Sequence, residues 1–193
     1  MPRLRRSWPI RGRRGRCRRA DRAGGAGITE RTVPERSTPT IVVDADACPV
    51  KQEVYRVAER YDLDVLLVAA QWIRVPDRGR VRLILVRHED RLDAADDRIV
   101  EEVGPDDVAI TEDVHLAARC LDEGAKALSP RGRVFSRESI GEAVATRDLM
   151  ADLREAGLVT GGPKPFAKAD RSEFLQRLDE AVQEVRRRRA SEH

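Results

Sequence analysis

The 193-residue sequence predicts an α/β fold, in which helices cover both faces of a mainly parallel sheet to give three layers, α/β/α. Two observations predict this fold. Short runs of valine, isoleucine and leucine recur along the chain, as in strands that are buried on both faces. Segments whose apolar residues recur at helical spacing lie between these runs. Strands and helices that alternate in this way form parallel sheets covered by the connecting helices.

One stretch of sequence predicts the first strand and the first helix. Residues 41–43 are isoleucine and two valines, and Pro49 opens a segment with apolar residues at helical spacing. A proline suits the first turn of a helix, where its missing N–H group needs no partner. Further strands are expected at residues 64–70, 81–86, 108–111 and 125–128. Further helices are expected at residues 90–103, 114–123 and 136–156, with Ser136 as the cap of the last, and Asp170 caps a final amphipathic helix.

Residues 1–38 are predicted to be a disordered, arginine-rich N-terminal extension, and residues 39–189 a single domain. Residues 1–36 contain 12 arginines and three acidic residues, without hydrophobic periodicity. A segment of this composition buries too little apolar surface to fold. The extension either binds nucleic acid through phosphate contacts or results from an early start codon. The second explanation is favoured, because the arginines are not interleaved with aromatic residues that would stack on bases.

The composition excludes several classes of protein. No stretch approaches the ~20 apolar residues that span a membrane. Cys17, Cys48 and Cys120 are odd in number and have no pairing spacing, and no secretory signal precedes them. A reducing, cytoplasmic setting without a disulfide-linked partner is therefore expected. Three histidines are too few and too scattered for a zinc site.

Acidic side chains follow expected strands or open expected helices at three places in the chain. They are Asp44 with Asp46, Asp93 with Asp96 and Asp97, and Asp113 with Glu112. The carboxyl ends of parallel strands share one edge of the sheet, so these acids are expected to meet there. Carboxylates that face one another repel, and Mg²⁺ or Mn²⁺ relieves that repulsion. The alternative is that the acids only cap helices, as Asp46 would cap the first one.

An acidic site of this kind is suited to metal-dependent hydrolysis of phosphodiesters. Two other functions stay open. Asp44 and Asp46 form the Asp-x-Asp pattern of phosphohydrolases, in which the first acid is a covalent nucleophile and the second a general acid. The chain could instead be a binding module for nucleic acid or metal that does not catalyse a reaction.

The chain also resembles the YaiI/YqxD family of bacterial proteins, which is itself similar to the PIN-like nucleases. The motifs that carry the resemblance extend over residues 40–185. They are Val43-Asp44-Ala45-Asp46-Ala47-Cys48-Pro49-Val50-Lys51, Asp93-Ala94-Ala95-Asp96, Ile110-Thr111-Glu112-Asp113, Pro130-Arg131-Gly132, Thr160-Gly161-Gly162-Pro163, and Asp170-Arg171 with Phe174. The resemblance implies a PIN-like fold, a Mg²⁺ or Mn²⁺ site and RNA as the substrate.

The resemblance also implies roles for individual residues. Asp44, Asp93 and Asp113 match the catalytic acids of PIN-like nucleases, and Asp46 and Asp96 complete the expected set of metal ligands. Apart from the resemblance, the side-chain chemistry of Lys51, Gln71 and Arg131 makes them candidates to contact the substrate, and an ordinary surface charge is the alternative for Lys51 and Arg131. The chain departs from the family at Ala70-Gln71, where asparagine usually precedes the glutamine, and in the charged segment 87–91. Cys48 and His115 are expected to be packing or surface residues.

Overall fold

The structure is a computed structural model that describes residues 38–46, 48–77, 79–86, 93–159 and 165–191. All of them belong to one compact unit, residues 32–193. The expected disordered extension and the Thr160–Pro163 motif lie outside the described residues, apart from Thr38 at the end of the extension. No helix in the described ranges is both long and apolar enough to cross a bilayer.

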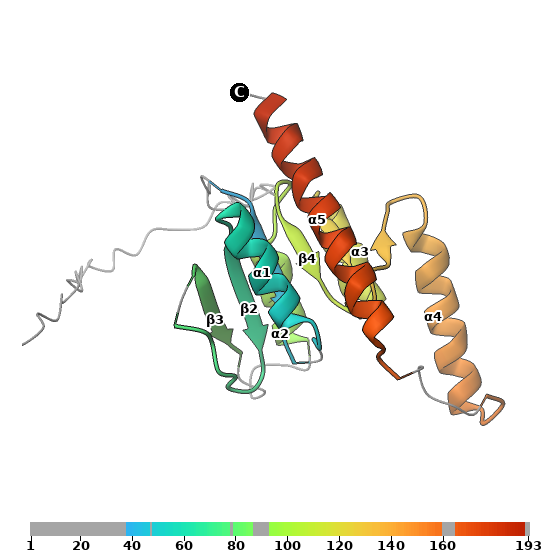
Figure 1. Ribbon diagram of the computed structural model, residues 1–193. Helices are drawn as coiled ribbons and strands as arrows, with labels where there is room; N and C mark the ends of the chain where they lie inside the picture. The colour runs from blue at the N-terminus through green and yellow to red at the C-terminus, as the bar shows by residue number, and fades with distance from the viewer. Residues whose placement is uncertain (1–37, 47, 78, 87–92, 160–164, 192–193) are drawn as a thin grey trace, which may run out of the picture. The chain divides into compact units, whose positions relative to one another are not determined.

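The described residues form one six-stranded sheet (Figure 1). Its strands are β1 (Thr40–Asp44), β2 (Asp64–Ala69), β3 (Val81–Leu85), β4 (Val108–Ile110), β5 (Lys126–Leu128) and β6 (Val134–Phe135). Their order in space is β3-β2-β1-β4-β5-β6. The first five strands pair in parallel, and only β6 is antiparallel to its neighbour β5. The predicted mainly parallel sheet is therefore confirmed.

Helices cover both faces of this sheet. They are α1 (Lys51–Tyr61), α2 (Ala94–Glu102), α3 (Val114–Asp122), α4 (Ile140–Glu155) and α5 (Lys168–Ser191). Helices α1 and α5 pack on one face, with buried residues of both in one cluster, and α2 and α3 pack on the other (Figure 1). Helix α4 packs beside α3. The three-layer α/β/α architecture expected from the sequence is confirmed.

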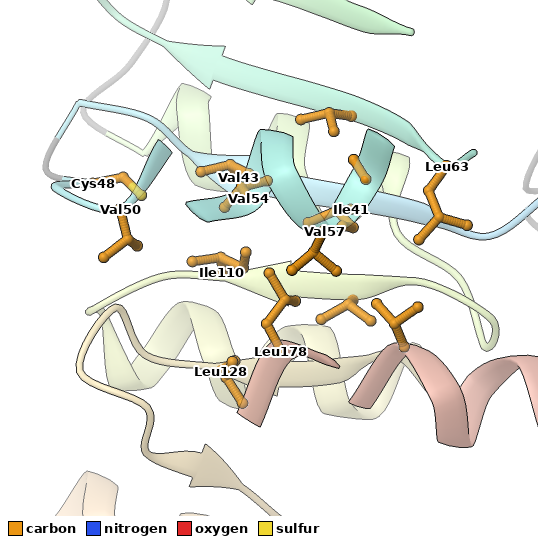
Figure 2. Close-up of a cluster of buried hydrophobic side chains, with 14 of the residues drawn as sticks. Ile41, Val43, Cys48, Val50, Val54, Val57, Leu63, Ile110, Leu128 and Leu178 are labelled. Carbon is orange, nitrogen blue, oxygen red and sulfur yellow. The ribbon is translucent and has the colours of Figure 1, made fainter. Parts of the chain in front are cut away.

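The two faces of the sheet are separated by the alternation of side chains along each strand. In β1, Ile41 and Val43 join the cluster under α1 and α5 (Figure 2), whereas Val42 joins the cluster under α2 and α3. Burial of each such side chain contributes about 1.5–3 kcal/mol. By the same alternation Asp44 is directed toward the side of α2 and α3. The alternation of buried side chains along β1 thus determines that the neighbours of Asp44 come from the side of α2 and α3.

The segment after β5 differs from the prediction. Residues 134 and 135 form β6, and the following helix begins at Ile140 instead of directly after Ser136. The Ser136 hydroxyl accepts from the main-chain N–H of Ser139 at 3.3 Å, in the turn that precedes the helix. Asp170 was predicted to begin the last helix as its cap, but that helix begins two residues earlier, at Lys168, so the predicted start is wrong. From the first turn, Asp170 accepts from the main-chain N–H of Ala167 at 2.8 Å and so still satisfies a donor at the start of the helix.

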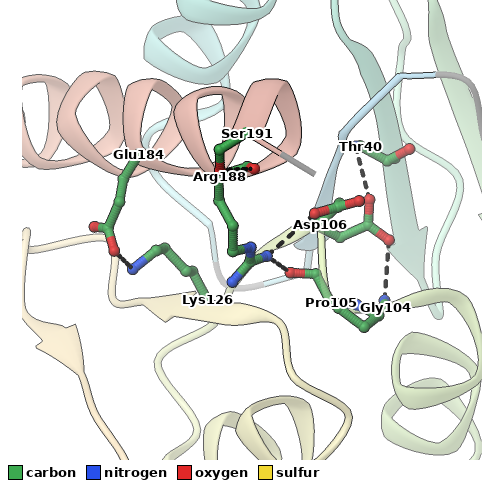
Figure 3. A network of polar contacts seen from close by, with 9 residues as sticks. Thr40, Gly104, Pro105, Asp106, Lys126, Glu184, Arg188 and Ser191 are labelled. Carbon is green, nitrogen blue, oxygen red and sulfur yellow. Dashed lines mark hydrogen bonds and ion pairs between the residues drawn. The ribbon is translucent and has the colours of Figure 1, made fainter. Parts of the chain in front are cut away.

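The amino edge of the sheet is tied together by polar contacts (Figure 3). Asp107, which is 4% exposed, accepts from the main-chain N–H groups of Thr40 at 2.8 Å and Gly104 at 3.0 Å. Arg188 of α5 pairs with Asp106 at 3.2 Å. A buried carboxylate is retained where main-chain donors replace its water shell. These contacts join the start of β1 to the turn before β4 and to the end of α5.

Candidate functional site

The candidate site lies at the carboxyl edge of the sheet, between the central strands β1 and β4. From β1 the chain moves outward to β2 and β3 on one side, and it then places β4 and β5 on the other side. The direction of strand addition therefore reverses between β1 and β4, and ligands bind at this point in open α/β sheets. Asp44 ends β1 here, and Thr111 and Asp113 follow β4.

Thr111 joins the ends of β1 and β4 through two hydrogen bonds. Its Oγ1 donates to Oδ2 of Asp44 at 3.0 Å and accepts from the main-chain N–H of Asp113 at 3.0 Å. Thr111 is 2% exposed, so both bonds are shielded from water. Thr111 belongs to one of the family motifs but was not predicted to be a site residue, because a β-branched residue at a strand end is ordinary. Its hydroxyl fixes the direction of the Asp44 carboxylate.

Asp113 is held by the start of α3. Its Oδ1 accepts from the main-chain N–H groups of His115 at 2.7 Å and Leu116 at 3.2 Å, which makes Asp113 the N-cap of that helix. The capping alternative is thus correct for one oxygen of Asp113. No hydrogen bond from another described residue engages its Oδ2. This second oxygen remains available to a ligand at the edge of the sheet.

Asp46 is held by β2 and does not cap α1. Its Oδ2 accepts from the main-chain N–H of Ala70 at 2.7 Å, one residue beyond the end of β2. Helix α1 begins after Val50 without a hydrogen bond from a side-chain cap. The capping alternative for Asp46 is therefore wrong. The bond to Ala70 fixes the loop after β1 against the end of the neighbouring strand.

Helix α2 contributes Asp93 and Asp96. Asp93 stands at the N-cap position without a side-chain cap bond, and Asp96 lies in the first turn. The pKa of Asp96 is raised to about 6, mainly by partial burial and also by the charges of Asp113, Asp44 and Asp93, against the opposing effect of Arg119. Asp97 turns away and pairs with Arg119 at 2.6 Å. Asp96 is therefore the acid of this turn that faces the ends of β1 and β4.

The pKa of Asp44 is raised as well. Burial is the largest cause, and the charges of Asp46 and Asp113 add to it. The hydrogen bond from Thr111 and the charge of Lys51 act in the opposite direction. A carboxylate whose pKa is raised by other acidic groups lies near them with too little positive charge to balance their charges. The charges of Asp46 and Asp113 thus act on Asp44, and those of Asp113, Asp44 and Asp93 act on Asp96, so these acids lie within electrostatic reach of one another.

The donor set at this place fits a hard divalent cation. All five side chains offer carboxylate oxygens, which Mg²⁺ and Mn²⁺ prefer, and neither sulfur nor imidazole is among them. Asp44, Asp46 and Asp113 are each held through one oxygen, as ligating carboxylates commonly are. Across the described ranges, no three Asp, Glu, His or Cys side chains already stand in the arrangement of a metal centre. Binding of a cation therefore requires the carboxylates to turn toward one another.

Lys51, Gln71 and Arg131, the expected substrate contacts, all lie close to this edge of the sheet. Lys51 Nζ donates to the main-chain carbonyls of Ala45 at 2.5 Å and Cys48 at 2.8 Å, so it holds the loop after β1. Gln71 is exposed in the segment that leaves β2. These placements are compatible with contact to a ligand, although Lys51 already uses two of its donors within the loop.

Arg131 is positioned by the turn that precedes β6. Its guanidinium pairs with Asp170 at 2.9 Å and with Glu112 at 3.6 Å. Gly132 has a φ of +86°, and a Cβ atom there would lie 2.8 Å from Cγ of Glu173 and 3.0 Å from the main-chain carbonyl carbon of the same residue. The Pro-Arg-Gly motif therefore packs directly against α5. It holds Arg131 beside Glu112, the neighbour of Asp113.

Cys48 and His115 take the packing and surface positions that were expected. Cys48 is 5% exposed and unpaired, and burial is the main cause that raises the pKa of its thiol. A thiol with a raised pKa is a poor nucleophile. The exposed His115 contacts Asp148 of α4, with Nε2 and Oδ1 2.9 Å apart.

The fold and the site define a three-layer α/β/α protein with an acidic cluster at the point where the order of its parallel strands reverses. Comparison with known families places the chain more closely. Residues 42–184 match the family described as "Uncharacterized BCR, YaiI/YqxD family", and the chain belongs to this family. The predicted family membership is confirmed, and a PIN-like placement is consistent with it.

Bacterial relatives share about half of the residues over most of the chain. A UPF0178 protein of Rhodopseudomonas palustris (strain TIE-1) is 51% identical over 151 residues, which cover 78% of this chain and 94% of the relative. UPF0178 protein BRADO3147 of Bradyrhizobium sp. (strain ORS 278) is 48% identical over 157 residues, 81% of this chain and 94% of the relative. No solved structure matches the chain significantly.

Proposed function

We propose that this protein is a Mg²⁺- or Mn²⁺-dependent phosphodiesterase that cleaves single-stranded RNA. The observation that carries the proposal is that the pKa values of Asp44 and Asp96, on β1 and α2, are raised, first by burial and then by the charges of neighbouring carboxylates. Parts of the chain that are distant in sequence bring like charges together at the strand-order reversal. Such an arrangement costs stability and is typical of sites that bind a ligand.

Each residue has a distinct part in the proposed reaction. Asp44, Asp93 and Asp113 are the acids on which catalysis depends, and Asp46 and Asp96 complete the set of ligands. Thr111 orients Asp44, and the N–H of Ala70 orients Asp46. A bound divalent cation would activate water and stabilise the charge that develops on the phosphate. Arg131, beside Glu112, is placed to contact a phosphate group of the RNA.

The phosphohydrolase alternative needs Asp46 to donate a proton as a general acid. Oδ2 of Asp46 instead accepts a hydrogen bond from the main-chain N–H of Ala70. This bond occupies one carboxylate oxygen of Asp46 and leaves only the other for the general-acid role. Mass spectrometry of the protein after reaction with a phosphate monoester tests this alternative directly. A phosphate attached to Asp44 would replace our proposal with the nucleophile mechanism.

Cleavage of short single-stranded RNAs of varied sequence tests the proposed function. We expect products in Mg²⁺ or Mn²⁺ and none after the metal is removed with EDTA. A second arm measures RNA binding under the same conditions. RNA binding without products under any metal would reject catalysis and support the binding-module alternative. Neither binding nor cleavage would reject RNA as the ligand.

A further inference from the structure

We infer that Trp72 and Arg74 form a platform that binds an unpaired base and its phosphate in the RNA at the candidate site. This inference rests on the proposed function and specifies how the site recognises single strands. Single-stranded nucleic acid is typically bound by an aromatic side chain that stacks on a base and a cation that contacts the backbone. Residues 71–75, directly beyond β2, present both groups.

The segment after β2 is anchored so that these two side chains face solvent. Ile73 and Val75 are partly buried against the core under α1 and α5. Trp72, between Ile73 and the end of β2, is 72% exposed, and Arg74 is exposed as well. Exposure therefore alternates along residues 72–75, as expected where successive side chains point in opposite directions. The contacts of Ile73 and Val75 with the core anchor the backbone that presents the tryptophan.

This segment begins at the candidate site. Oδ2 of Asp46 accepts from the N–H of Ala70, and Trp72 follows two residues later. Two residues of extended chain reach at most about 7 Å. A base stacked on Trp72 therefore belongs to a nucleotide within a few positions of the phosphate held at the carboxylates. A single exposed tryptophan is not by itself evidence of a binding site. Trp72 is a candidate because it lies beside the acidic cluster.

Charge supports a nucleic-acid strand as the occupant. Within the part of the chain that the structure describes, Arg74 forms no ion pair, whereas Arg131 and Arg80 have carboxylate partners. The nearby carboxylates repel phosphate unless a cation is bound, so a neighbouring unpaired guanidinium offsets part of that repulsion. Arg74 places a positive charge two residues beyond Trp72, along the segment that leaves β2. The RNA strand would pass from the carboxylates toward Trp72.

Tryptophan fluorescence provides a direct test, because the chain contains only Trp8 and Trp72. A Trp8→Phe variant of the full chain leaves Trp72 as the single reporter. Titration of this variant with a short oligouridylate, in EDTA to prevent cleavage and separately in Mn²⁺, should change its fluorescence saturably. A ribose-phosphate oligomer without bases should bind without this change.

Affinity variants complete the test. Trp72→Ala should weaken oligouridylate binding about 5- to 100-fold, and Trp72→Phe should retain most of the affinity because it keeps an aromatic face. Leu158→Ala is the matched control, because Leu158 is 74% exposed and lies after α4. Arg74→Gln should weaken binding mainly at low salt.

The outcomes separate this inference from the proposed function. Unchanged binding by Trp72→Ala, or no fluorescence change in either condition, would overturn the platform even if the protein cleaves RNA. Self-association that depends on Trp72, with RNA binding unaffected, would also overturn it and assign the surface to a second copy of the chain. Fluorescence quenching without cleavage would keep the platform and reject the catalytic proposal alone.

Discussion

The two edges of the sheet carry the same kind of side chain in different surroundings. At the amino edge, Asp107 is buried but accepts main-chain N–H groups from two segments, and Asp106 pairs with Arg188. At the carboxyl edge, the pKa values of Asp44 and Asp96 are raised, first by burial and then by the charges of other carboxylates. The acids at the amino edge have hydrogen-bond donors or a cation as partners, and these contacts hold the fold together. The acids at the other edge raise the pKa values of Asp44 and Asp96, and in our proposal a bound cation balances their charges.

The largest expected effect is the loss of activity when an acid at the carboxyl edge is neutralised. Asp44→Asn and Asp113→Asn should lower kcat/KM for RNA cleavage by about 10²–10⁴-fold, since each removes a charge on which catalysis depends. Asp179→Asn is the matched control, because Asp179 bonds to Tyr61 at the far end of α1 at 2.9 Å. Equal activity in all three variants would contradict the assignment of the site.

At the amino edge, removal of a carboxylate should lower the free energy of unfolding and not the activity. Asp107→Ala leaves the N–H groups of Thr40 and Gly104 without this acceptor and should cost about 2–4 kcal/mol of unfolding free energy. Urea denaturation measures the change. Asp44→Asn should cost much less, because it also removes repulsion. If Asp44→Asn proves the more destabilising of the two, the contrast between the edges is wrong.

A further effect on stability is expected at the carboxyl edge, in the turn that carries Arg131 and packs against α5. Gly132→Ala should destabilise the fold by about 1–3 kcal/mol, because its positive φ and its contact with Glu173 leave no room for a Cβ atom. Thermal unfolding at one pH measures this effect. The matched change is Gly141→Ala, since nothing lies within 4 Å of a Cβ atom there. That variant should be neutral or slightly stabilising.

Thr111 offers a smaller effect within the site itself. Thr111→Val keeps the shape of the side chain but removes the hydroxyl that bonds to Asp44, so kcat/KM should fall about 10-fold. Thr111→Ser restores the hydroxyl and should recover most of the activity. The pKa of Asp44, followed by NMR of the carboxyl carbon without metal, should rise further in Thr111→Val. An unchanged pKa would show that the hydrogen bond does not orient this carboxylate.

The smallest effect is a dependence of stability on pH. The pKa of Asp96 is about 6 in the folded chain, above the ordinary value of 3.8, so the folded state holds this proton more tightly. The contribution of Asp96 to stability is therefore fully present below pH 3.8 and is lost as the pH rises through about 6. In EDTA, Asp96→Asn should remove this part of the slope. A slope that persists unchanged would place its origin elsewhere.

The acids at the carboxyl edge of the sheet were easier to predict from the sequence than the hydrogen bonds that hold them. Asp44 and Asp113 could be placed because buried strands are easily recognised and parallel strands end together. The bond between Asp46 and Ala70 depends on how β1 and β2 align, and local sequence does not specify this. The two-residue strand β6 was missed because it is too short to show periodicity. The exposure of Trp72 could not be predicted, because it follows from the burial of Ile73 and Val75 against the core.

Calorimetric titration with Mn²⁺ tests the central claim most directly, namely that the carboxylates at the strand-order reversal form a cation site. The titration compares the wild-type chain with Asp44→Asn, Asp113→Asn and the control Asp179→Asn. We predict saturable binding that is weakened at least about 10-fold in the first two variants and unchanged in the control. No binding by the folded wild-type chain, or equal binding by all four proteins, would contradict the claim.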